Sequence, residues 1–215
     1  MNHSLDASVE PSRDSFLRHH PEWKYCFWDD AACELLIQQE YPDFLDCWIN
    51  LRPEIKKWDV ARVLILHARG GLYADIDVVF HRNLEDIFDP ERKLIFRSPV
   101  KRSDGRVTDI KNHFIYSRKG VDIWERFLAY VRDYPVDSNQ ALANSVIPHT
   151  GGRALGAVVA DSLESAVLVE SDIQFLPHKY VINHNFRYEE KAEGFSQDML
   201  YAEHHCHGSW LVSQE

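Results

Sequence analysis

Apolar residues along this chain repeat with helical spacing in some segments and form short, β-branched runs in others. The helical pattern predicts helices over residues 31–40, 54–69, 121–134, 138–147 and 152–163, with one more after Pro42. The short runs predict strands over residues 25–28, 72–80, 93–99, 111–117, 166–171, 173–178 and 179–183, and in the tail from residue 199. Helices and strands alternate first and mix later, which predicts an α/β fold with a mostly parallel sheet.

Composition narrows the classes of function. The chain has 215 residues, of which 45% are hydrophobic and 27% charged, as in ordinary globular proteins. Its formal net charge of −10 argues against a nucleic-acid binder, which needs a basic surface to neutralise phosphates. No apolar run reaches the roughly eighteen residues of a membrane span. The first residues also lack the apolar core of a secretory signal, so a cytoplasmic protein is expected.

The chain shows no internal repeat and no linker, which predicts one folded domain over residues 16–215. Residues 1–15 are polar and small, and they predict a flexible N-terminal arm. The cysteines show no CxxC spacing, and we expect free, buried thiols rather than disulfides. These cysteines are Cys26, Cys33, Cys47 and Cys206.

Two carboxylates interrupt the apolar run over residues 72–80. In a continuous strand Asp75 and Asp77 share a face, roughly 6–7 Å apart, while Ile76 and Val78 face a core. Two such acids repel each other unless a cation or hydrogen-bond donors lie between them. Carboxylate oxygen is the ligand that Mg²⁺ and Mn²⁺ prefer, so the pattern favours a divalent-metal site. The alternative is a solvated pair at a strand end.

The helix before this run carries a second pair of charges. It is apolar on nearly every side, so it is expected to be buried, and Gly70 and Gly71 end it. Asp59 and Arg62 are three residues apart and therefore share a face. They form either a structural ion pair or a pair that hydrogen-bonds a polar ligand such as a sugar.

Three histidines gather in the tail, at His204, His205 and His207, just before Gly208-Ser209-Trp210. Neutral imidazole is a common metal ligand, and a tail that folds back over the carboxylates would complete a metal site. The alternative is an exposed histidine cluster without function.

Taken in order, these motifs resemble the DXD-containing sugar-binding region of family 32 glycosyltransferases. The family pattern is Asp-x-x-Arg, an apolar helix, then Gly-Gly-x-Tyr-x-Asp-x-Asp, and here it runs from Asp59 to Asp77. "HTGGRAL" resembles the family's Thr-Gly-Pro-x-Ala-Leu turn, with Gly152 in place of proline. "YAEHHCHGSW" resembles its closing His-His-x-x-Gly-Ser-Trp. The order and spacing of these segments carry the resemblance.

The resemblance implies a GT-A fold with a Rossmann-like central sheet, and a divalent metal, Mn²⁺ or Mg²⁺, between the protein and a diphosphate. Asp77 is then the direct ligand, and Asp75 reaches the metal or the ribose and sugar. His205 is our choice for the third metal ligand, with His204 and His207 as rivals.

The resemblance also assigns residues to the nucleotide sugar. Asp59 and Arg62 hold the hydroxyls of the donor sugar, Asn112 lies near the donor or acceptor sugar, and Tyr73 belongs to the donor-binding motif. Ser209 and Trp210 close over the diphosphate.

The implied function is transfer of a sugar from a UDP- or GDP-sugar to a glycan or other hydroxyl acceptor. Retention of configuration is implied too, but the chain offers no clear nucleophile, since Asp59 is assigned to hydroxyl binding. The base-binding strand Ile-Pro-Lys-x-Ile-His-x-x-Trp of relatives is not found, which leaves the base open. The alternatives are a non-catalytic nucleotide-sugar-binding module and a Mg²⁺-dependent phosphohydrolase with an Asp-x-Asp motif.

Overall fold

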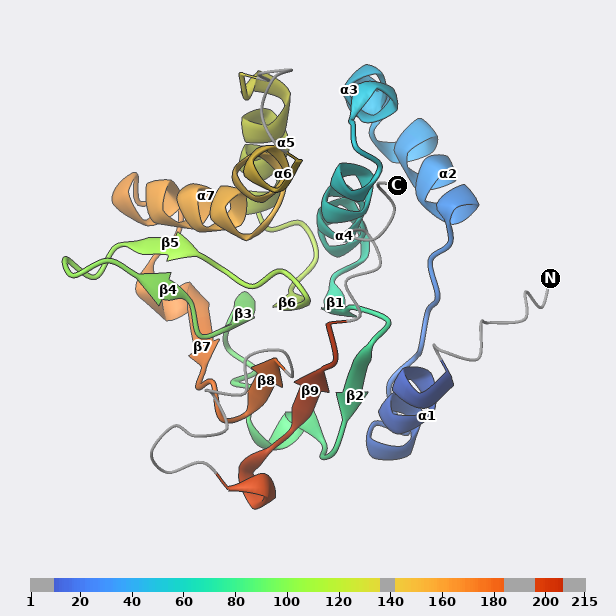
Figure 1. Cartoon of the computed structure of the whole chain (residues 1–215), viewed down its shortest axis with the longest axis vertical. Helices are drawn as coiled ribbons and strands as arrows, with labels where there is room; N and C mark the ends of the chain where they lie inside the picture. Colours follow the sequence, from blue (N-terminus) through green and yellow to red (C-terminus); the bar gives the residue numbers. More distant parts are fainter. Residues whose placement is uncertain (1–9, 136–141, 184–195, 207–215) are drawn as a thin grey trace. The chain divides into compact units, whose positions relative to one another are not determined.

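The computed structural model describes residues 10–135, 142–183 and 196–206. These residues fall into two compact units, each of which is assembled from separate stretches of the chain (Figure 1). Unit 1 takes its residues from Met1–Phe27, Ala74–Pro90 and Leu176–Glu215, and unit 2 from Trp28–Tyr73 and Glu91–Phe175.

Unit 2 contains most of the helices. Its helices are α2 (Asp30–Glu40), η1 (Pro42–Phe44), α3 (Leu45–Asn50), α4 (Ile55–Arg69), α5 (Ile123–Asp133), α6 (Leu142–His149), α7 (Gly152–Glu164) and η3 (Glu170–Asp172). Its strands are β1 (Gly71–Ala74), β3 (Leu94–Arg97), β4 (Val100–Lys101), β5 (Val107–Asp109), β6 (Phe114–Ser117) and β7 (Ile173–Leu176). The predicted helices that became α2, α4, α5 and α7 are confirmed, because strong periodicity and clear ends such as Gly70 mark them in the sequence. Of the helix predicted over residues 138–147, residues 138–141 lie outside the described residues, and the rest belongs to α6.

One sheet of unit 2 has the order β1-β6-β3-β7, and β4 pairs with β5 in a separate hairpin. Strands β3 and β6 run antiparallel, as do β4 and β5. Helix α7 lies along β5 (Figure 1). The buried side of α4, with Val60, Val63 and Leu64, lies in the hydrophobic core of this unit.

Unit 1 is built around a three-stranded sheet of order β2-β9-β8. Its elements are α1 (Glu10–His19), β2 (Val78–Phe80), η2 (Leu84–Asp86), β8 (Val181–Asn183), η4 (Gln197–Met199) and β9 (Ala202–His204). Strand β9 runs antiparallel to β2 and parallel to β8. The sheet of unit 1 is therefore mixed, and unit 2 contains antiparallel pairs, so the prediction of a mostly parallel sheet is not confirmed.

Helix α1 packs on β2 (Figure 1). The rings of Phe16 and Phe80 lie 5.2 Å apart, edge to face, an arrangement that aromatic pairs prefer. Ser12 donates to the carbonyl of Val78, and the Phe80 amide donates to Ser15 Oγ, so the helix also satisfies backbone groups of this strand. The expected N-terminal arm over residues 1–15 thus differs from the structure from Glu10 onward, where α1 begins.

Three predicted strands are absent or divided in the part of the chain that the structure describes. Residues 25–28 form no strand, and residues 166–171 form a turn and part of η3. The run 72–80 is divided into β1 and β2, which belong to different sheets. No helix among the described residues is long and apolar enough to span a membrane.

Candidate functional site

The two acids of the DXD motif lie in a turn, not in a strand. The Val78 amide donates to the carbonyl of Asp75 at 3.0 Å, which closes a β-turn over these four residues. Ile76, at the tip of the turn, is 55% exposed, so the prediction that it faces the core is wrong. Val78, where β2 begins, is fully buried, as expected.

The sheet of unit 1 brings this turn to the end of β9. Val78, the first residue of β2, pairs with His204, the last residue of the antiparallel β9. The residue after His204 continues the contact, since the His205 amide donates to the carbonyl of Asp77 at 3.1 Å. The strand register therefore fixes which tail histidine lies beside the carboxylates.

His204 is that histidine. Its Nε2 lies 3.1 Å from Asp77 Oδ1 and 3.6 Å from Asp75 Oδ2, and all three side chains are mostly buried. One ligand atom from each of the three residues lies within 4.8 Å of those of the others. Two carboxylate oxygens and one imidazole nitrogen at this separation fit a single divalent cation.

The electrostatics of His204 reflect this position. Burial by itself lowers its pKa, but the hydrogen bond from its ring to Asp77, the contact with Cys206 and the charges of both acids outweigh burial. Together they raise the pKa of His204 to about 9. Without a cation, the ring is thus held as an imidazolium that offsets the two carboxylates.

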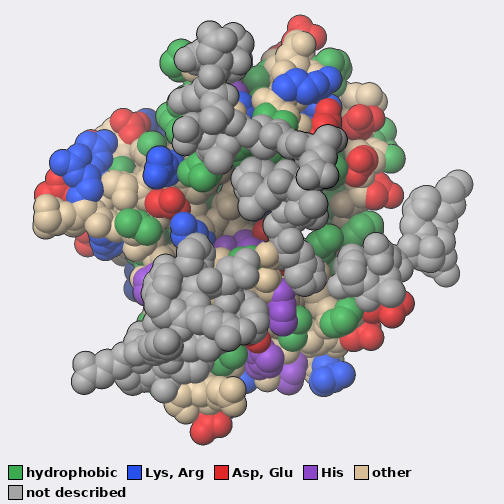
Figure 2. Space-filling model, viewed as in Figure 1, with side chains coloured by type: hydrophobic (Ala, Val, Ile, Leu, Met, Phe, Trp, Pro, Cys, Tyr) green, Lys and Arg blue, Asp and Glu red, His purple; other side chains and the backbone are tan. Residues whose placement is uncertain are grey.

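The predicted ligand was a different histidine of the tail, His205, with His204 and His207 as rivals. The structure favours His204 over our choice His205, whose Nε2 lies 4.0 Å from Glu203 Oε2. His207 lies outside the described residues, as do Ser209 and Trp210. Figure 2 shows histidine side chains gathered over the β2-β9 part of this sheet.

A second polar cluster lies in unit 2 and contains the other predicted residues. Asp59 is only 5% exposed, yet its carboxylate accepts from Asn112 Nδ2 at 2.8 Å and from Thr150 Oγ1 at 2.9 Å. It also pairs with Arg62 Nη2 at 3.2 Å. The structure thus brings Asp59, Arg62 and Asn112 together, and it adds Thr150 from the "HTGG" turn.

Arg62 makes two further contacts in this cluster. Its Nη1 donates to the backbone carbonyl of Asn112 at 2.7 Å, and its guanidinium lies 4.9 Å from the centre of the Tyr73 ring. Burial lowers the pKa of the neighbouring Lys56, and the Asp59 carboxylate opposes that shift. These contacts support the structural ion pair left open by the sequence, and binding of sugar hydroxyls stays a prediction.

Sequence reasoning missed two residues that contact His204. Cys206 Sγ lies 3.1 Å from His204 Nδ1, and Asn183 contacts both the thiol and the ring. All four cysteines carry thiols rather than disulfides, as expected, but only Cys33 is buried and Cys26 is exposed. Two signals were available: Cys206 lies within the histidine-rich tail, and Asn183 ends an otherwise apolar strand.

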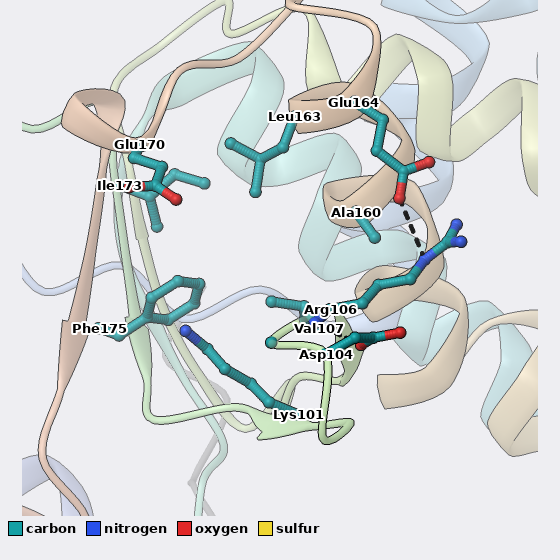
Figure 3. Close-up of a pocket in the computed structure, with 11 residues that line it drawn as sticks. Lys101, Asp104, Arg106, Val107, Ala160, Leu163, Glu164, Glu170, Ile173 and Phe175 are labelled. Atoms are coloured by element: carbon teal, nitrogen blue, oxygen red, sulfur yellow. Dashed lines mark hydrogen bonds and ion pairs between the residues drawn. The ribbon is translucent and has the colours of Figure 1, made fainter.

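A surface cleft of unit 2 lies between the β4-β5 hairpin, α7 and β7, with a volume of about 620 Å³. Figure 3 shows Lys101 and Phe175 on one side of it, Leu163 on the other, and the Arg106–Glu164 ion pair at its rim. Of the described residues that line it, none is a predicted site residue.

Comparison with known proteins shows which family the first part of the chain is similar to. Residues 7–94 match the family described as "Glycosyltransferase sugar-binding region containing DXD motif". The match includes Asp59, Arg62, Tyr73, Asp75 and Asp77, and it confirms the resemblance seen in the sequence. The matched residues end before Asn112 and the histidine-rich tail.

Individual relatives are yeast mannosyltransferases. The chain is 30% identical over 117 residues to a mannosyl phosphorylinositol ceramide synthase of Saccharomyces cerevisiae, covering 54% of this chain and 31% of that protein. It is 43% identical over 63 residues to an initiation-specific alpha-1,6-mannosyltransferase of Candida albicans, covering 28% of this chain and 16% of that protein. The matches thus span less than a third of either relative.

Among solved structures, the chain is similar to the PaToxG glycosyltransferase. The TM-score is 0.51 at 15% identity, covering 78% of this chain and 69% of that one. At this identity the similarity concerns the fold alone, which is a mixed α/β fold also found in a glycosyltransferase.

Proposed function

We propose that this protein is a metal-dependent glycosyltransferase of the GT-A type, which moves a hexose from a nucleoside diphosphate sugar to a hydroxyl acceptor. The observation that carries the proposal is the convergence of Asp75, Asp77 and His204. This set of donor atoms lies at the DXD motif of a sugar-binding region, where a cation would meet a diphosphate.

The three side chains have separate tasks. Asp77 and Asp75 supply hard oxygen ligands for the cation, and His204 supplies a nitrogen through Nε2. The imidazole favours Mn²⁺ over Mg²⁺, which prefers a shell of oxygens. When bound, the metal stabilises the negative charge that develops on the leaving diphosphate.

The buried position of these residues helps the reaction. Side chains that are mostly withdrawn from water act on charge more strongly than they would in solution, and they need no reorganisation. The expected stereochemical course is retention, as the family resemblance implies.

The names of the relatives suggest the donor to test first. Both transfer mannose according to their names, so GDP-mannose is our first candidate, with UDP-sugars as the comparison. The acceptor is a hydroxyl of a glycan or a small molecule.

The test measures release of nucleoside diphosphate from GDP-mannose and from a panel of UDP-sugars, with Mn²⁺ or Mg²⁺. We expect release with at least one donor, and its loss with chelator and in Asp77→Ala, which removes one ligand of three. Asp86→Asn changes an exposed carboxylate of the same unit and should keep wild-type activity. Full activity of Asp77→Ala in chelator would overturn the proposal.

The alternatives give different results in the same assay. A non-catalytic binding module would bind a donor without releasing the diphosphate. A phosphohydrolase would release phosphate from a simple phosphomonoester without any sugar transfer. The anomeric configuration of the product, read by NMR, decides between retention and inversion.

A further inference from the structure

Cys206 has an unusual backbone conformation for its residue type. Its φ is 54°, in the left-handed region that side chains other than glycine, asparagine and aspartate seldom adopt. This conformation is strained for a residue with a side chain, and such strain clusters at functional sites. It also turns the chain directly after β9, so that the thiol comes back against the ring of His204, two residues earlier.

The contacts of the thiol define a chain of hydrogen bonds. Cys206 Sγ lies 2.7 Å from Asn183 Oδ1, to which it donates, and 3.1 Å from His204 Nδ1. Asn183 is held in place because it is the last residue of β8 and pairs with His204 in the parallel register. It is also buried, with an exposure of 6%. Asn183 Nδ2 lies farther from the ring, at 3.4 Å from Nδ1.

These contacts have a consequence for the other side of the ring. Because the thiol proton is directed to Asn183, a sulfur lone pair accepts the proton on His204 Nδ1. In a histidine ligand, the hydrogen bond made by one ring nitrogen decides which nitrogen can bind metal. Nε2 is the nitrogen that faces Asp75 and Asp77.

We propose that Cys206 and Asn183 are positioning residues of the metal site, which fix the orientation of the His204 ring and keep the proton on Nδ1, leaving Nε2 for the cation. The proposal rests on the proposed metal-dependent function. It makes Cys206 a neighbour of the ligand, on the side of the ring away from the carboxylates, and not a ligand itself.

The test measures the affinity of the full chain for Mn²⁺ alone, by calorimetry or by the EPR signal of free Mn²⁺. Cys206→Gly removes the thiol and accepts the positive φ, so it should fold. We expect it to bind Mn²⁺ about 10-fold more weakly, at the low end of the 10–100-fold effect of residues that orient a metal ligand. Cys206→Ser keeps a hydroxyl that can accept and donate, and it should restore most of the affinity. Cys26→Ser alters an exposed cysteine of the same unit and should bind as wild type does.

The outcomes separate this proposal from the function on which it rests. If wild type binds Mn²⁺, Asp77→Ala does not, and Cys206→Gly binds as wild type does, the positioning role is overturned and the metal site stands. If wild type itself fails to bind Mn²⁺, both proposals fall. Cobalt-loaded protein provides a spectroscopic check: a thiolate-to-cobalt charge-transfer band that disappears in Cys206→Gly would make Cys206 a ligand and overturn its positioning role.

Discussion

His204 Nε2 lies 3.1 Å from Asp77 Oδ1, although 126 residues lie between the two along the chain. The contact arises because β2 begins directly after Asp77 and β9 ends at His204, with the two strands antiparallel and in register. A shift of the register by one residue would bring a different side chain to the carboxylates, since strand residues alternate between faces. The pairing of β2 with β9 is therefore what specifies the candidate metal ligand.

Replacement of the two neighbouring histidines should have unequal effects on metal binding. We expect His204→Ala to weaken Mn²⁺ binding by more than about 100-fold, because a ligand contributes more than a residue that only orients it. His205→Ala should change the affinity little, since that ring lies near Glu203. Calorimetric titration of both variants with Mn²⁺ makes the comparison, and the reverse order would restore His205 as the ligand.

Loss of the Asp59 carboxylate should destabilise unit 2. In Asp59→Ala the buried Arg62 loses its ion pair with Asp59, and we expect the free energy of unfolding to fall by about 3–5 kcal/mol. Thr150→Val removes one hydrogen bond to the same carboxylate at nearly constant volume, and it should cost about 1–3 kcal/mol. Urea unfolding followed by tryptophan fluorescence measures both.

The control for this pair is Glu34→Ala, which removes an exposed carboxylate from α2 of the same unit and should change little. An equally small loss in Asp59→Ala would contradict a structural role for the network. A role of Asp59 in sugar binding is tested separately, by the KM for the donor. The conservative variant Asp59→Asn should raise this KM. Thr150→Val, which affects stability, should leave it unchanged.

The helices were predictable from the sequence because their signals are local. The apolar face of α5, with Trp124, Phe127 and Val131, repeats at helical spacing, and Gly70 ends α4 with a φ of 70°. The strand over residues 72–80 was mispredicted for the converse reason. Ile76 belongs to an apolar run in the sequence, but its exposure follows from β1 and β2 joining different sheets, which only non-local pairing decides.

The candidate site was predictable in residue type but not in detail. The spacing of Asp75 and Asp77 and the histidines of the tail indicated a metal site, and the two acids do lie together with one of those histidines, His204. The choice between His204 and His205 depends on the strand register, which no local pattern reveals. The left-handed backbone of Cys206, which brings its thiol to the His204 ring, is likewise invisible in the sequence.

The stability of the protein should fall as the pH drops below about 6.5, in part because of His20. This ring is fully buried, its Nε2 accepts from the Leu84 amide at 3.0 Å, and its Nδ1 donates to the Phe16 carbonyl. Burial lowers the pKa of His20 below its ordinary value of 6.5, aided by the neighbouring His19, while the Phe16 carbonyl and Glu85 oppose the shift.

The direction follows from proton linkage. The unfolded chain takes up a proton at about pH 6.5 and the folded chain only at lower pH, so acid favours unfolding until the folded pKa is passed. Urea unfolding of wild type and His20→Gln from pH 8 to pH 5 isolates this contribution, which should be constant above about pH 7 and decline below it. The raised pKa of His204, about 9, adds stability as the pH falls from 9 to about 6.5, and this opposite slope is common to both proteins. His20→Gln, which does not titrate, should be less stable at pH 8 but decline less steeply, and an unchanged slope would exclude His20 as a source of the effect.

Gly156 should resist replacement even by alanine, because helix α7 approaches the backbone of β5 there. A Cβ at this position would lie 2.6 Å from the carbonyl carbon of Thr108 and 2.7 Å from the amide nitrogen of Asp109. Replacement of glycine by alanine in an ordinary helix interior stabilises a protein by about 1 kcal/mol.

At Gly156 the backbone of the strand cannot move as a flexible side chain would. We therefore expect Gly156→Ala to lower the free energy of unfolding by about 1–3 kcal/mol, as overpacking does. Arg153→Ala, at an exposed position of the same helix, is the control and should stay within about 0.5 kcal/mol of wild type in the same urea titration. Equal or greater stability of Gly156→Ala would mean that α7 and β5 can separate at little cost.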